Sequence, residues 1–155
     1  MKPVKLSRKA SGRNLVVRNL ATSLVLYERI QTTPAKARAA QMHTERLITL
    51  AKKWKACDNV GEKLALRRQI ISRTADDLAV KKLTEVLADL FAERQGGYTR
   101  RIKLGRRLGD GAEQVVLSLT ERTNVTKAKP EVKAVKRSKA EKSEETTEAP
   151  KIEET

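Results

Sequence analysis

The sequence is poor in cysteine, histidine and aromatic residues, and each shortage argues against a class of protein. Its 155 residues include one cysteine, Cys57, and one histidine, His43. A single cysteine excludes an intramolecular disulfide and fits a reducing compartment, while one cysteine and one histidine alone cannot build a metal site. Aromatic residues make up 3% of the chain, so we do not expect a module that stacks the bases of single-stranded RNA.

Long apolar runs are also missing. No segment approaches the roughly 20 apolar residues that span a bilayer, and the N-terminal MKPVKLSRKASGR has no apolar stretch typical of a signal peptide. We therefore expect a cytoplasmic protein without a membrane partner.

Acidic residues are few beside the basic ones. The chain has 34 Lys and Arg against 19 Asp and Glu, a net charge of +15 and an isoelectric point near 10.2. Residues 1–126 hold 26 of the basic and 12 of the acidic residues, so nearly all the excess lies on the part expected to fold. This balance favours a nucleic-acid partner.

Hydrophobic spacing predicts four helices and three strands. The helices are expected at about 13–26, 34–55, 61–72 and 74–95, and the strands at 29–33, 98–104 and 115–120. Thr33 and Pro34 form a strong helix start, and Thr74 with Asp77 resembles a capping box. The order predicts an α+β fold of two layers, with a small sheet covered on one side by helices.

Apolar stripes on all four helices predict the core. The first helix has one apolar face and a basic face opposite it, the third offers three apolar residues, and the apolar residues of the fourth recur at helical spacing. In chain order these residues are Val17, Leu20, Ala21, Leu24; Leu47, Leu50, Ala51, Trp54; Leu64, Ile70, Ile71; and Val80, Leu83, Leu87, Leu90, Phe91.

A β-hairpin with a charged loop is expected at 96–122. Its first strand has Tyr98, Ile102 and Leu104 at alternating positions and its second has Val115, Leu117 and Leu119, so each strand is expected to have one core face. The loop between them contains Gly105, Gly109 and Gly111, which can adopt backbone conformations closed to other residues. Arg106 and Arg107 lie on this loop, with Asp110 as the nearby acid.

Composition divides the chain into three segments. Residues 1–13 form a basic arm, residues 14–122 an α+β domain that binds nucleic acid, and residues 123–155 a Lys/Glu-rich tail. The tail has no sustained apolar face and cannot bury enough surface to offset the entropy of ordering, so we expect it to be disordered. The arm is expected to become ordered against a phosphate backbone.

Residues for enzyme catalysis are scarce. His43 lies in the middle of a helix, Cys57 has no evident acid-base partner, and Asp76 with Asp77 is explained by the start of a helix. The glycines match neither a nucleotide-binding loop nor a dinucleotide fingerprint. We expect no enzymatic activity, no cofactor, no metal and no small-molecule substrate.

Basic residues without nearby acids are the best candidates for binding. Lysines on the helices, such as Lys53 and Lys81, are explained as a solvated surface. Two other regions concentrate cations, and an external polyanion best explains that concentration. The candidate RNA-binding residues are Lys5, Arg8, Lys9, Arg13, Arg18, Arg29, Lys36 and Arg38 in the first region, and Tyr98, Arg100, Arg101, Lys103, Arg106 and Arg107 in the hairpin.

Four segments resemble one known family. RNLATSL at 18–24, ERIQTTPAKAR at 28–38, ERLITLAKK at 45–53 and GGYTRRIKLGRRLGD at 96–110 closely resemble the L-seventeen family of bacterial large-subunit ribosomal proteins. The similarity covers about residues 5–122 and departs from the family pattern at Gly12-Arg13, where a His-Arg pair is usual.

The resemblance implies a non-catalytic constituent of the large ribosomal subunit. Such a protein binds ribosomal RNA, contacts neighbouring large-subunit proteins and lies near the exit of the nascent-peptide tunnel. It further implies helices packed on a three-stranded mixed sheet whose third strand lies between the other two. The alternative is a small DNA-binding or nucleoid-associated protein, but a helix-turn-helix reader needs a recognition helix rich in base-reading residues, whereas these cations are spread over several elements.

Overall fold

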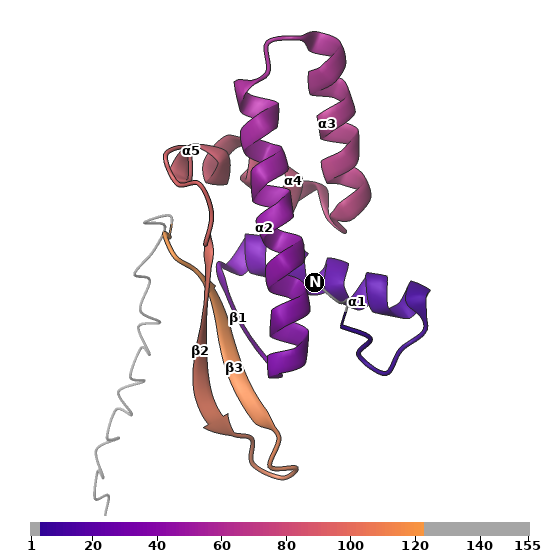
Figure 1. Ribbon diagram of the computed structural model, residues 1–155, viewed down its shortest axis with the longest axis vertical. Coiled ribbons are helices and arrows are strands. Elements are labelled where there is room, and N and C mark those ends of the chain that lie inside the picture. The colour runs from indigo at the N-terminus through magenta and orange to yellow at the C-terminus, as the bar shows by residue number, and fades with distance from the viewer. Residues whose placement is uncertain (1–3, 123–155) are drawn as a thin grey trace, which may run out of the picture. The chain divides into compact units, whose positions relative to one another are not determined.

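The computed structural model describes residues 4–122. Residues 1–3 and the predicted tail at 123–155 lie outside the described residues. The described elements are α1 (Ala10–Tyr27), β1 (Arg29–Thr32), α2 (Pro34–Ala56), α3 (Val60–Arg73), α4 (Asp77–Lys82), the π-helical turn η1 (Leu83–Leu87), α5 (Ala88–Leu90), β2 (Thr99–Arg106) and β3 (Glu113–Leu119). This is the predicted α+β order, with helices packed against one small sheet (Figure 1).

The three strands form an antiparallel sheet in the order β1-β3-β2. The expected central position of the third strand is confirmed, but the expectation of a mixed sheet is wrong. β3 runs antiparallel to both neighbours because it enters from the hairpin beside β2 and then lies against β1. β1 and β2 therefore have the same direction, but they are separated by β3 and form no parallel pair.

Local sequence signals explain most helix boundaries. α2 begins at Pro34 after an extended Thr33, as predicted, although the Thr33 hydroxyl makes no capping hydrogen bond. The predicted capping box at Thr74 is wrong. The Thr74 hydroxyl donates to the Ile70 carbonyl oxygen at the end of α3, and Asp76 caps α4 by accepting from the Leu78 amide at 3.0 Å. α1 begins at Ala10, three residues earlier than expected.

The core lies between the helices and the sheet. The apolar stripes of α2 and of the α4-η1-α5 segment are confirmed, with Leu47, Leu83, Leu87 and Phe91 fully buried. From β3, Val115, Leu117 and Leu119 join this core. On α3 the expectation holds only for Ile70, because Leu64 and Ile71 face solvent.

β2 departs most from the predicted pattern. Ile102 and Leu104 are about half exposed, so the predicted core face of this strand is wrong. β2 is an edge strand, and none of its apolar side chains joins the core formed by the helices and β3. A β-bulge places Leu104 as an extra residue between the pairs Lys103–Val115 and Gly105–Gln114, which interrupts the alternation of faces.

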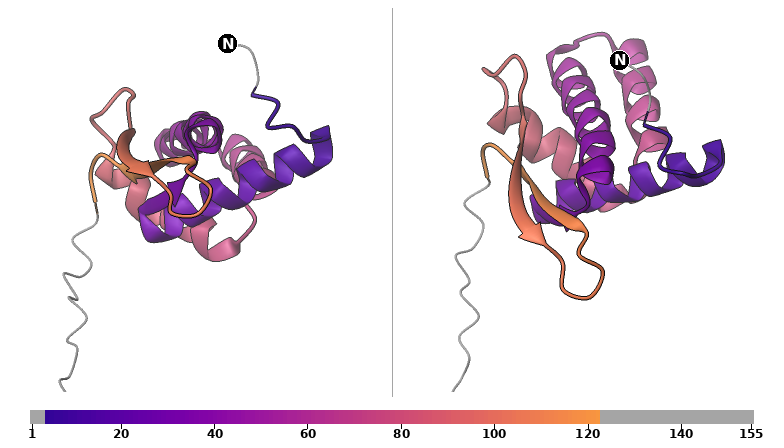
Figure 2. Two further views of the ribbon diagram at one scale, coloured as in Figure 1. Left: turned by 90° about the horizontal axis from the view of Figure 1, so that it is seen from below. Right: turned by 60° about the horizontal axis from the view of Figure 1, so that its bottom comes forward.

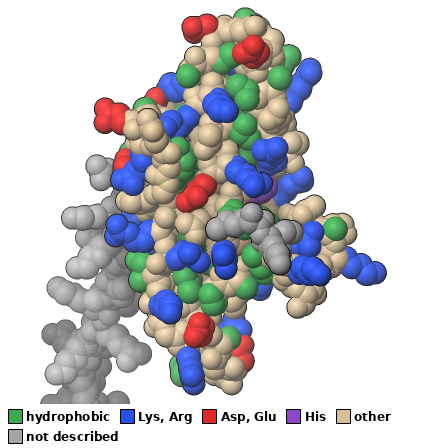
Figure 3. All heavy atoms as spheres, viewed as in Figure 1, with side chains coloured by type: hydrophobic (Ala, Val, Ile, Leu, Met, Phe, Trp, Pro, Cys, Tyr) green, Lys and Arg blue, Asp and Glu red, His purple; other side chains and the backbone are tan. Residues whose placement is uncertain are grey.

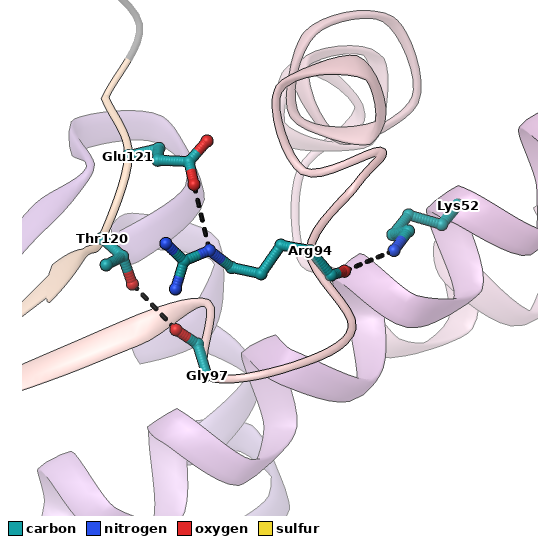
Figure 4. Close-up of polar contacts among 5 residues, drawn as sticks. All are labelled: Lys52, Arg94, Gly97, Thr120 and Glu121. Atoms are coloured by element: carbon teal, nitrogen blue, oxygen red, sulfur yellow. Dashed lines mark hydrogen bonds and ion pairs between the residues drawn. The ribbon is translucent and has the colours of Figure 1, made fainter.

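The end of the β2–β3 hairpin that lies away from its loop is held against the helical layer by hydrogen bonds and an ion pair (Figure 4). Lys52 of α2 donates to the Arg94 carbonyl oxygen at 2.6 Å, and the Arg94 guanidinium pairs with Glu121 at 3.0 Å. The Thr120 hydroxyl donates to the Gly97 carbonyl oxygen at 2.9 Å. These bonds fix where β2 begins and β3 ends, while the loop end projects past the first turn of α2 (Figures 1 and 2).

Candidate nucleic-acid interface

Two predicted residues lie on the same face of the sheet, the one that points away from the helices. In the strand register, Arg29 of β1 and Arg100 of β2 lie on either side of Ser118 of β3. Paired residues in neighbouring strands share a face, so both arginine side chains lie on the same side, about 10 Å apart from two strand spacings. Both are exposed.

The other face of β2 carries Arg101 and Lys103. They pair with Leu117 and Val115, both of which point into the core, so the two cations lie on the helical side of the edge strand. With Pro34 and Gln41 they line a shallow depression beside the start of α2. Lys36, half-buried, and Arg38, exposed, lie in the first turns of that helix.

The two arginines predicted on the hairpin loop differ in position and pairing: Arg107 lies in the loop and pairs with Asp110, whereas Arg106 is the last residue of β2, opposite Glu113 in the strand register. The Arg107 Nε donates to the Asp110 Oδ1 at 2.9 Å, and a second guanidinium nitrogen contacts Oδ2. The hydrogen bond from Arg107 and that from the Ala112 amide lower the pKa of Asp110 to about 2. Arg106 makes no ion pair within the described residues. The loop turns through Gly109 and Gly111, with φ of 100° and 64°, which confirms the role predicted for these glycines.

Tyr98 is removed from the candidate set by its burial. Only 4% of the residue is exposed, and its ring packs edge-to-face on Phe91 with centroids 5.2 Å apart. Lys52 lies over the same ring at 5.7 Å. Tyr98 is therefore a core residue that anchors the start of β2 on the helices. Because its ring is buried, it has no exposed face on which a base could stack.

The remaining predicted residues lie on the arm and on α1. Lys5, Arg8 and Lys9 are exposed before or at the start of that helix. Arg13 is half-buried, and Arg18 donates to the Ser72 carbonyl oxygen at the end of α3.

Three residues that were not predicted complete a basic hollow around Arg13 and Arg18. Arg46 and His43 of α2 and Arg73 of α3 line it from the other sides, and no acidic side chain lines it among the described residues. Arg38 and Arg46 are eight residues apart, so they share one face of α2 at a spacing of about 12 Å. That spacing was present in the sequence, but only packing shows that α1 and the end of α3 bring further arginines to this face.

Few basic side chains of residues 4–122 are paired with acids. Lys55, Lys82 and Arg94 have acidic partners in Asp89, Glu28 and Glu121. Among the predicted cations in residues 4–122, only Arg107 has an ion pair. Figure 3 shows Lys and Arg side chains spread from the helices to the hairpin over the face that carries α2, with few acids between them. This surface therefore suits a polyanion.

The described part of the chain has neither a cluster of metal ligands nor a membrane-spanning helix. No three His, Cys, Asp or Glu side chains lie together as metal ligands in residues 4–122. None of the helices described there combines the length and apolar character needed to cross a bilayer.

Comparison with known proteins identifies the family. The sequence model of "Ribosomal protein L17" matches residues 16–120. The chain is 46% identical to large ribosomal subunit protein bL17 of Solibacter usitatus, over 74% of this chain and 71% of that protein. It is 44% identical to the bL17 of Fervidobacterium nodosum, over 78% and 97%, and 43% identical to that of Syntrophotalea carbinolica, over 94% and 90%. The chain therefore belongs to the ribosomal protein L17 family, whose members are structural and non-enzymatic.

Proposed function

We propose that this protein is a structural constituent of the large ribosomal subunit that binds ribosomal RNA through its basic surface. The observation that carries the proposal is the concentration of basic side chains that have no paired acid. Of the cations in the hairpin, the start of α2 and the hollow, only Arg107 has an ion pair within the described residues, and no acidic side chain lines the hollow there. Uncompensated cations repel one another, and a polyanion removes that repulsion.

The relatives named above support the ribosome as the location. They are called large ribosomal subunit proteins, and their family is non-enzymatic, which agrees with the expectation that this chain is not an enzyme. A large-subunit protein of a bacterium lies in the cytoplasm, so the proposal includes this location and contacts with ribosomal RNA and neighbouring large-subunit proteins.

The distribution of the cations favours RNA over DNA. A helix-turn-helix protein concentrates its contacts on one recognition helix in a major groove. Here the unpaired cations come from α1, α2, β1 and β2 on several faces. An irregularly folded RNA can approach such a surface from more than one side, whereas a straight duplex contacts only one.

Sedimentation tests the proposed function. An epitope-tagged copy expressed in a bacterium should sediment with large subunits through gradients of moderate salt, at about one copy per subunit. A variant in which Arg100, Arg101, Arg106 and Arg107 are changed to Glu should shift to the top of the gradient. Recovery of the wild-type protein with nucleoid DNA, and not with subunits, would favour the DNA-binding alternative.

The finer location near the tunnel exit has its own test. Ribosomes stalled on nascent chains with a photoreactive residue near the N-terminus should cross-link to this protein once that residue leaves the tunnel. Cross-linking at no chain length, in subunits that contain the protein, would contradict this location.

A further inference from the structure

The basic hollow lies where three helices meet. Arg13 and Arg18 come from α1, Arg46 from the exposed face of α2, and Arg73 from the last residue of α3. Its volume is about 430 Å³, within the roughly 300–1,000 Å³ of pockets that hold small organic groups. The hollow is therefore large enough for one nucleotide.

Two of the polar side chains hold the walls in place. Arg18 donates to the Ser72 carbonyl oxygen, and the His43 Nε2 lies 3.0 Å from the Arg73 carbonyl oxygen. These are among the last carbonyl groups of α3, which have no partner within their own helix. The Thr22 hydroxyl, which accepts from the Ala75 amide at 3.0 Å, ties α1 to the same corner. Arg18 and His43 thus have a structural explanation.

Arg13, Arg46 and Arg73 have no comparable explanation. No hydrogen bond or ion pair joins any of these guanidinium groups to another side chain in residues 4–122, and no carboxylate lines the hollow there. Three guanidinium groups around one depression form a site for phosphate, since each offers several donors in a planar fork.

Apolar side chains form another part of the lining. They are Val4, Val17 of α1, and Ala39 and Met42 of α2, and Met42 also lines the adjoining depression together with Gly96 and Tyr98. A phosphate needs no such surface. A base or a ribose does, because an unstacked base gains by packing on apolar side chains or on guanidinium planes.

We propose that the hollow binds one unpaired nucleotide of an RNA strand, with its phosphates at Arg13, Arg46 and Arg73 and its base against Val17 and Met42. The inference rests on the proposed RNA-binding function and adds a distinct element to it. The hairpin contacts backbone by charge alone, whereas the hollow selects a nucleotide that has left the stack.

Two RNA hairpins test this with the purified full-length protein. One has a continuous stem, and the other is identical except for a single unpaired uridine in the stem. The wild type should bind the second roughly tenfold more tightly, as expected for one packed base. Met42→Ser should remove this preference and leave the salt dependence of binding unchanged. Leu64→Ser, on the exposed side of α3, is the matched control and should retain the preference.

A second pair of variants addresses the phosphate contacts. Arg46→Ala with Arg73→Ala should make the salt dependence for the unpaired-uridine hairpin shallower by about 0.7–0.9 in log-log slope per arginine. Arg67→Ala with Arg68→Ala removes the same charge from α3 outside the hollow and should change the slope less. Equal effects of the two double variants would overturn the assignment of phosphate to the hollow. If the Arg46→Ala, Arg73→Ala variant has a lower melting temperature than the wild type, the Met42→Ser variant still tests whether the hollow binds the unpaired nucleotide.

Cross-linking locates the nucleotide directly. A photoreactive uridine at the unpaired position should attach to the tryptic peptide 39–46, which contains Met42. Attachment only to peptides of the β2–β3 hairpin, or equal affinity of the wild type for both RNAs, would overturn the proposed nucleotide site in the hollow. Either result would leave the proposed RNA binding intact. Failure of the wild type to bind either RNA at moderate salt would overturn both proposals.

Discussion

β2 and β3 are hydrogen-bonded to each other along one hairpin, yet their surroundings differ. From Val115 to Leu119 every residue of β3 is buried, whereas from Arg100 to Arg106 every residue of β2 is exposed. β3 occupies the centre of the sheet and packs under the helices, and β2 lies at the edge. Position in the sheet therefore decides which strand builds the domain and which presents charge.

The two faces of β3 reach burial by different means. Leu117 joins the core beneath the helices. Val116 points to the other face, where its partners in the register are Gln31 and Ile102, and Gln31 donates to Gln114 at 2.5 Å. The apolar Ile102 on β2 thus covers its neighbour while remaining half exposed itself. The difference between the strands predicts four measurable effects.

The largest expected effect is on stability. Leu117→Ala in β3 should lower the free energy of unfolding by about 2–5 kcal/mol, because the side chain is fully buried and its loss leaves a cavity. Ile102→Ala in β2 should lower it by about 1 kcal/mol or less, since the residue is 48% exposed. Chemical denaturation of both variants provides the comparison. Equal losses would mean that the edge strand carries as much of the core as the central one.

The next effect is on RNA affinity. Arg106→Ala with Arg107→Ala should weaken binding to a ribosomal RNA fragment and make the log-log salt slope shallower by roughly 0.7–0.9 for each arginine that neutralises a phosphate. The melting temperature should hardly change, because both side chains are exposed. Lys53→Ala with Lys81→Ala is a control of equal charge on exposed helix positions. A slope unchanged from the wild type would remove the loop from the interface.

The single variants should differ from each other. Arg107 is already paired with Asp110, and its backbone amide and carbonyl bond to Ala112 and Gly111 in the same loop. Arg106 makes no ion pair within the described residues, although Glu113 lies opposite it in the strand register. Arg106→Ala should therefore change the salt slope more than Arg107→Ala, in titrations of the same RNA at several salt concentrations. The reverse order would show that Arg107 leaves Asp110 when RNA binds.

The smallest effect is the titration of Asp110. Its pKa in the folded protein is about 2, below the ordinary 3.8, so folding favours the ionised form. The Arg107–Asp110 contact should be complete above about pH 4 and be lost as the pH falls through 2. Carboxyl NMR shifts should follow this titration, and in Arg107→Ala the pKa should move up toward 3.8. An unchanged pKa in that variant would assign the shift to the Ala112 amide.

The sequence predicted what local chemistry controls. Pro34 begins α2 because its ring suits the first helical turn, and the alternation of Val115, Leu117 and Leu119 marks the face that enters the core. The glycines of the hairpin loop adopt the positive φ values expected of them. The cations of the hairpin are as exposed as predicted, and their contacts with RNA remain a proposal.

Tertiary contacts decided what the sequence could not. Ile102 alternates like a core residue, but whether helices cover an edge strand is set by packing of segments far apart in the chain. Tyr98 lies beside the hairpin cations in the sequence, but its ring packs on Phe91. Arg46 and Arg73 are ordinary helix-surface residues in sequence, and only the meeting of three helices places them around one hollow.

A map of RNA cross-links to the intact protein in purified large subunits tests the central claim most directly. We predict RNA cross-links on β2 and the hairpin loop, at Arg29 beside Arg100, and at the hollow lined by Arg46 and Arg73, with none at Lys55 or Lys82, which are paired with acids. Cross-links concentrated around Lys55 and Lys82, with the hairpin and the hollow free of RNA, would contradict the account.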